Sequence, residues 1–136
     1  MIAGVYNITI EQGSTFGRLI SVEQPNLAAD PTGQTFENFN LAGFTARMHI
    51  RRTIDTASPM ITLTTENGRI AINPNIAGNA TKNNEISLMI TAADTATITT
   101  SGVYDLEIIS AGGTVSKVIR GDVTLIPEVT DRKSVV

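Results

Sequence analysis

Apolar and polar residues alternate along much of the chain, which is typical of β-strands that bury one face. In the clearest case, residues 44–51, the even positions are apolar and the odd positions are polar or charged. The alternation predicts about nine short strands. They are Tyr6–Ile10, Phe16–Val22, Phe44–Arg51, Ile61–Leu63, Ile70–Ile72, Ile86–Ile90, Tyr104–Ile108, Val115–Ile119 and Val123–Ile126.

Turn residues separate these segments. Glu66-Asn67-Gly68 predicts a tight hairpin because Asn and Gly tolerate positive φ, and Ala111-Gly112-Gly113 predicts another. Short strands joined by turns, without helical crossovers, favour an antiparallel β-sandwich or barrel. The one helical candidate, Thr91–Thr97, is too short for more than a turn or two. We therefore expect an all-β fold with one short connecting helix.

Two segments are longer than hairpin turns require. Gln24–Leu41 is rich in Asn, Pro and Gly but contains Phe36 and Phe39, and Pro74–Asn84 is rich in Asn. Loops beyond about 12–15 residues are uncommon without a function, so we expect Phe36 and Phe39 to contact a partner. The alternative is a plain insertion whose two rings close the edge of the core.

Length and composition indicate one domain. The chain has 136 residues, of which 41% are hydrophobic and 17% charged, and this suits a single core over residues 1–129. The polar residues 130–136 are expected to form a flexible tail. The chain has no cysteine, so disulfides and thiolate metal sites are excluded. It lacks a signal-peptide pattern and any run of about 20 apolar residues, so we expect a soluble, unexported protein.

Charge and motifs argue against nucleic-acid binding and catalysis. A net charge of -3 provides no basic surface for phosphates. The single histidine, His49, lies between Arg47 and Arg51, and two cations oppose a third. Asp105 and Glu107 lack the aromatic platforms usual in a glycosidase cleft, and no phosphate-binding Gly loop or Gly-x-Ser-x-Gly motif occurs. We expect no enzyme activity, metal or cofactor.

The arginines of the 44–51 strand are candidate contact residues. Arg47 and Arg51, followed by Arg52, could meet an acidic partner surface. Charges on an exposed strand face also guard strand edges against pairing with other molecules, and this alternative stays open.

The segment Thr99–Leu106, a turn followed by Gly-x-Tyr-x-apolar, resembles the tyrosine corner of immunoglobulin-like sandwiches. In that motif, a Tyr hydroxyl near the start of a strand bonds to backbone a few residues upstream, so we expect this of Tyr104. Leu106 stands where antibody domains have a cysteine, which fits a cysteine-free relative. The alternative is an ordinary core tyrosine.

The order of segments resembles a family of small proteins from tailed bacteriophages. These are the immunoglobulin-like N-terminal domain of baseplate upper proteins and related tail-associated virion proteins. The family implies an immunoglobulin-like antiparallel β-sandwich, made in the host bacterial cytoplasm and assembled into the virion, without catalytic residues. Residues 24–40 are longer than the family pattern. The resemblance is carried by residues 6–16 (YNITIEQGSTF), 41–51 (LAGFTARMHIR), 64–70 (TTENGRI), 102–107 (GVYDLE) and 121–130 (GDVTLIPEVT).

We therefore expect a structural protein that adheres to neighbouring tail or baseplate proteins in a symmetric, multi-copy assembly. The partners are expected to be proteins, with neither nucleic acid nor membrane involved. Two alternatives are a capsid decoration or cement protein and a carbohydrate-binding module for host attachment. Sugar sites usually stack on exposed aromatic rings, and only 4% of the residues are aromatic, with no Trp.

Overall fold

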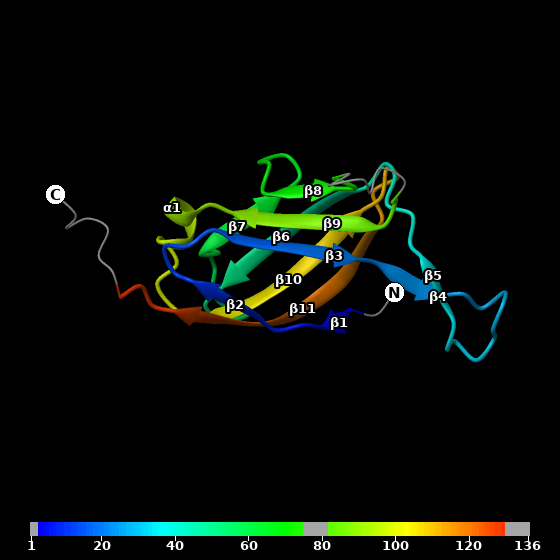
Figure 1. The fold of residues 1–136 in the computed structure, drawn as a ribbon, viewed down its shortest axis with the longest axis horizontal. Helices are drawn as coiled ribbons and strands as arrows, with labels where there is room; N and C mark the ends of the chain where they lie inside the picture. Colours follow the sequence, from blue (N-terminus) through cyan, green and yellow to red (C-terminus); the bar gives the residue numbers. More distant parts are fainter. Residues whose placement is uncertain (1–2, 75–81, 130–136) are drawn as a thin grey trace.

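The computed structural model describes residues 3–74 and 82–129, and in them the fold is all-β with one short helix (Figure 1). The strands and the helix follow in chain order. They are β1 (Gly4–Val5), β2 (Ile8–Glu11), β3 (Phe16–Ser21), β4 (Glu23–Pro25), β5 (Phe36–Asn38), β6 (Thr45–Arg51), β7 (Ile61–Thr64), β8 (Ile70–Ile72), β9 (Glu85–Ile90), α1 (Ala92–Thr95), β10 (Gly102–Ile109) and β11 (Val115–Ile126).

Two sheets form the body of the protein (Figure 1). The larger has the order β1-β11-β10-β6-β7, with β2 also paired to β11, and the smaller has the order β3-β9-β8. β1 and β2 run parallel to β11, whereas the other neighbours are antiparallel. The larger sheet is therefore mixed, where the sequence predicts only antiparallel pairing. Parallel neighbours need a long connection, and almost the whole sandwich separates β2 from β11.

The core lies between the two sheets and follows the predicted alternation. In β6, Ala46, Met48 and Ile50 are buried while Thr45 and Arg47 face outward, which confirms the two-sided strand. At the N-terminus the pattern shifts, because Ile8 and Ile10 are buried but Tyr6 is 40% exposed. The largest fully buried side chains come from both sheets and the connections. They are Ile10, Leu41, Met48, Ile50, Leu63, Ile86, Leu88, Ile90, Ile98, Leu106, Ile108 and Val123.

The two predicted turns have different outcomes. Residues 111–113 join β10 to β11 as a hairpin, in which Ser110 N–H donates to Thr114 O over 2.9 Å and Gly113 has a φ of 91°. The tight hairpin predicted at Glu66-Asn67-Gly68 is wrong, because β7 and β8 belong to different sheets. This turn instead carries the chain across the sandwich, with Gly68 at a φ of 81°.

The structure also tests the other segments predicted from the sequence. The two strands predicted at 115–119 and 123–126 form one continuous strand, β11. The predicted short helix is confirmed as α1, which connects β9 to β10 and is capped by Thr91. Residues 24–41 are not a plain loop, since β4 and β5 pair within them. Part of the predicted 74–84 loop and the predicted tail 130–136 lie outside the described residues.

Candidate functional site

The strongest candidate contact region is residues 23–38, which we call the arm. β4 and β5 pair here with Glu23 opposite Asn38 and Pro25 opposite Phe36, and the arm extends away from the two sheets (Figure 1). Its tip is closed by backbone bonds, from Asn26 N–H to Thr35 O over 2.8 Å and from Asp30 N–H to Asn26 O over 2.9 Å. The arm is therefore a projection whose backbone conformation is fixed by its own hydrogen bonds.

Asp30 organises the tip of the arm. Its carboxylate accepts hydrogen bonds from the Thr32 hydroxyl over 2.6 Å, from Thr32 N–H over 3.0 Å and from the Thr35 hydroxyl over 3.1 Å. These bonds, the Thr32 hydroxyl first, lower the pKa of Asp30 because they favour the charged carboxylate. The tip thus holds its conformation through local polar contacts, without a core of its own.

The arm exposes large apolar side chains. Phe36 is 56% exposed and Leu27 is 59% exposed. Leu27 was not predicted as a contact residue, although a single leucine in a polar segment is a usable signal. Burying such a side chain stabilises a protein or complex by about 1.5–3 kcal/mol. A partner that covered Leu27 and Phe36 would therefore be bound more tightly by this free energy.

Phe39 has a different environment from Phe36. It is half-buried, packs against the core and meets Phe44 edge-to-face with 5.6 Å between ring centroids. Its backbone N–H donates to Val22 O over 3.0 Å, which ties the base of the arm to β3 and β4. Phe36 thus keeps the role of a candidate partner contact, whereas Phe39 closes the edge of the core, as in the alternative interpretation.

The candidate arginines lie on the outer face of the larger sheet and already have intramolecular partners. Arg47 forms an ion pair of 2.9 Å with Glu107. Arg51 donates to the carbonyl oxygens of Thr56 and Ala57 over 2.8 and 3.0 Å. Edge protection by these arginines is excluded, because β6 is paired with β7 on one side and with β10 on the other. Arg47 therefore links β6 to β10, and Arg51 links β6 to the loop that contains Thr56 and Ala57.

An open depression of about 760 Å³ lies on the same outer face, between β6, β10 and β11. Its lining carries both signs of charge, including a 2.6 Å ion pair between Lys117 and Asp105. The hydrogen bond to Asp105, and then its charge, raises the pKa of Lys117. Mixed charges that neutralise one another favour neither a phosphate nor a cation as ligand.

His49 contributes to the lining of this depression, and in the described part of the chain it has no metal-binding neighbourhood. Its Nδ1 is 3.1 Å from the Arg51 guanidinium. Within residues 3–74 and 82–129, no three His, Cys, Asp or Glu side chains are grouped so that they could hold a metal ion. No helix in the described part of the chain is long and apolar enough to cross a membrane.

Tyr104 anchors the N-terminal segment to the core. Its ring is buried, and its hydroxyl donates to the carbonyl oxygen of Tyr6 over 2.5 Å. The partner therefore lies at the other end of the chain, which differs from a tyrosine corner with its acceptor a few residues upstream. Burial raises the pKa of Tyr104 to about 12, with a smaller contribution from Tyr6.

Gly121 makes this bond possible. It lies opposite Tyr104 in the β10–β11 ladder, and a Cβ on it would lie 2.3 Å from the Tyr6 oxygen. The role of this glycine could not be predicted from the sequence, because its contact is with a segment more than a hundred residues away in sequence. Asn7 reinforces the same junction by accepting from Asp122 N–H over 3.0 Å.

Replacing Tyr104 with phenylalanine is expected to lower the free energy of unfolding by about 1 kcal/mol, the usual net value of such a hydrogen bond. The measurement is the urea midpoint of the two proteins. Tyr6→Phe is the matched control, because the acceptor is the backbone carbonyl of Tyr6 and the exposed ring is retained. If both variants unfold at the unchanged midpoint, Tyr104 contributes only by packing.

No protein-family model matches this chain, and a comparison with curated proteins found no match either.

Proposed function

We propose that this chain is a structural, non-enzymatic component of the tail or baseplate of a tailed phage, in which the sandwich presents the arm to a neighbouring tail protein. The observation that carries the proposal is the arm itself. It is ordered by its own hydrogen bonds, yet it exposes Leu27 and Phe36, which add nothing to the core. A preformed projection with apolar side chains suits a contact that loses little entropy on binding.

The strand order supports an immunoglobulin-like sandwich, as the phage resemblance implies. In immunoglobulin domains, strands G, F and C form one sheet, to which variable-type domains add C′, and B, E and D lie in the other. If β3 is taken as B, the order β11-β10-β6-β7 corresponds to G-F-C-C′ and the order β3-β9-β8 to B-E-D. We infer that this chain has that topology, in which the first strands, β1 and β2, also pair with the last strand, β11.

The arm offers a contact that many copies can multiply. One contact made by Leu27 and Phe36 buries little area, so a single copy would bind weakly. In a symmetric ring the same contact repeats at each subunit, and the linked copies bind far more tightly than one. We therefore expect the arm to insert into an apolar pocket on the adjacent tail protein.

The test uses the phage that encodes this chain. Tails and heads are separated from purified particles and each fraction is assayed for the chain. We expect it in the tail fraction, and we expect Leu27→Ala/Phe36→Ala to weaken its binding to tails assembled without this chain by about 100-fold, from the apolar burial lost. The matched control is Leu19→Ala, which alters another leucine that is 44% exposed but lies outside the arm.

Each outcome separates the alternatives. The chain in the head fraction would favour a decoration protein, and its absence from particles would refute the virion proposal. Normal binding by a folded arm variant would exclude the arm as the contact while leaving the tail location intact. Binding to host glycans in place of tail proteins would favour the carbohydrate-binding alternative.

A further inference from the structure

β7 is the last strand at one side of the larger sheet, and among residues 3–74 and 82–129 it pairs only with β6. Its sequence, Ile-Thr-Leu-Thr, contains neither a charged residue nor a proline. These are the residues with which proteins commonly protect an exposed strand edge, because unpaired backbone groups there can bind another strand. Protection of β7 must therefore come from elsewhere.

Asn67 occupies the free edge of β7. Its side-chain Nδ2 donates to Thr62 O over 2.9 Å, and its Oδ1 accepts from Thr64 N–H over 3.0 Å. One residue of a parallel neighbouring strand would make the same two bonds, to the residues before and after the one it faces. The Asn67 amide thus takes the place of a partner strand at Leu63.

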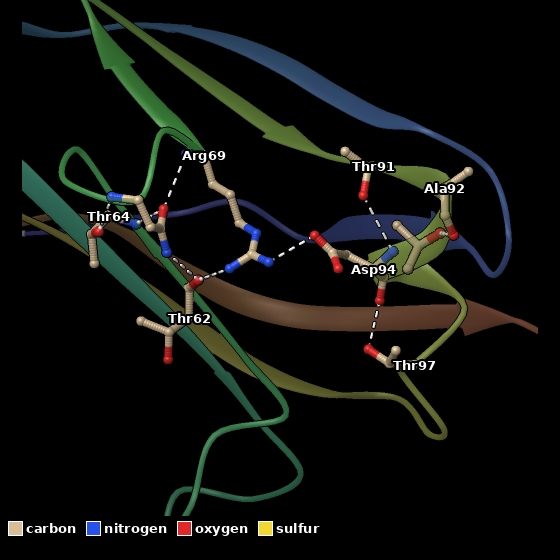
Figure 2. Close-up of polar contacts among 9 residues, drawn as sticks. Thr62, Thr64, Arg69, Thr91, Ala92, Asp94 and Thr97 are labelled. Atoms are coloured by element: carbon tan, nitrogen blue, oxygen red, sulfur yellow. Dashed lines mark hydrogen bonds and ion pairs between the residues drawn. The ribbon is translucent and has the colours of Figure 1, made fainter.

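Arg69 adds a second donor at the same edge. Figure 2 shows its guanidinium between β7 and α1, donating from Nη1 to Thr62 O over 3.0 Å and from Nη2 to Asp94 over 2.7 Å. Its backbone N–H also donates to Asn67 Oδ1 over 3.0 Å. The two side chains therefore form one connected group.

α1 holds the outer end of this group in place. The Thr91 hydroxyl accepts from Asp94 N–H over 3.3 Å, and the Thr97 hydroxyl donates to Asp94 O over 2.6 Å (Figure 2). The hydrogen bond from Arg69 keeps the pKa of Asp94 below its usual value. The carboxylate therefore stays charged to lower pH than a free aspartate, and its charge fixes the guanidinium.

We propose that Asn67 and Arg69 form an edge cap that prevents β7 from pairing with β7 of a second copy of this chain. A second copy is the occupant that fits, because antiparallel β7–β7 pairing about a two-fold axis at Leu63 would place Thr62 opposite Thr64. Thr pairs across strands are favourable, and no charge on either strand would oppose them. The inference does not rest on the proposed function, since it concerns a surface remote from the arm.

The test is Asn67→Ala/Arg69→Ala in the full chain, followed by sedimentation velocity over a concentration series. We expect the variant to dimerise at concentrations at least tenfold lower than the unaltered chain. Because the chain has no cysteine, an equimolar mixture of Thr62→Cys and Thr64→Cys copies in each background reports edge pairing as a disulfide, since this register places residue 62 of one copy opposite residue 64 of the other. We expect that crosslink only where the cap is removed. The control, Glu66→Ala, alters the same turn without touching either β7 bond.

Several results would overturn the proposal. One is a folded double variant that remains as monomeric as the unaltered chain and forms no crosslink. Another is equal dimerisation of Glu66→Ala. If the double variant does not fold, the single variant Asn67→Ala, which keeps Arg69 on Thr62 and Asp94, is judged by the same two measurements. If neither the double variant nor Asn67→Ala folds, the turn is required for folding, and this result would also reject the edge cap.

Discussion

Replacing Phe39 with alanine is expected to lower the free energy of unfolding by about 2–3 kcal/mol, whereas replacing Phe36 with alanine is expected to change it by less than about 0.5 kcal/mol. Phe39 packs against the core and Phe44, so its removal leaves a void. Phe36 lies three residues earlier but is mostly exposed, so its removal leaves none.

Chemical denaturation of the two single variants measures this difference directly. They serve as controls for each other, because the same side-chain atoms are removed from the same segment. Equal losses of stability would show that both rings belong to the core and would remove the basis for treating the arm as a contact. Equal and negligible losses would show that Phe39 contributes nothing at the base of the arm.

Replacing Gly121 with alanine is expected to lower the free energy of unfolding by about 2 kcal/mol or more, because the added methyl group overpacks a closed junction. The new Cβ would lie 2.3 Å from Tyr6 O and 2.8 Å from Asn7 Oδ1. The neighbour is backbone, so it cannot turn aside as a flexible side chain could. Displacing it also breaks the bond from Tyr104.

The matched control is Gly112→Ala, at the open tip of the β10–β11 hairpin. Its Cβ would meet only Ser110 Oγ, at 3.9 Å, and its φ is not positive. Thermal unfolding compares the two variants, and limited proteolysis reports whether residues 3–7 have been released. A Gly121→Ala protein with an unchanged midpoint would contradict the close approach of Tyr6.

Local patterns were enough to predict most of the strands. Alternation with a period of two depends only on neighbouring residues, so β6 and β10 were predicted with the correct faces. The turn at residues 111–113 was also correct, because it joins strands adjacent in the same sheet. The turn at 66–68 has equally suitable residues but joins different sheets, and the sheet that receives a strand is decided by tertiary packing.

The candidate site was less predictable for the same physical reason. That Arg47 and Arg51 face outward follows from the alternation, but their partners Glu107 and Thr56 follow from which strands and loops lie beside β6. In the sequence, Asn67 and Arg69 cannot be distinguished from ordinary turn residues. Their contacts with β7 can be interpreted only when β7 is known to be the edge strand of the sheet. Phe36 and Phe39 could not be separated by pattern, since the β4–β5 pairing decides which ring reaches the core.

The pairing of both N-terminal strands with β11 sets the order in which the protein can mature during synthesis. Asn7 bonds Asp122, 115 residues later, so β1 and β2 have no partner until nearly all the described chain has left the ribosome. Contacts this distant in sequence close slowly, and we expect folding on the scale of milliseconds to seconds. Until then, the apolar side chains of β2 are open to other nascent chains, so slowing translation before β11 has emerged from the ribosome should promote aggregation.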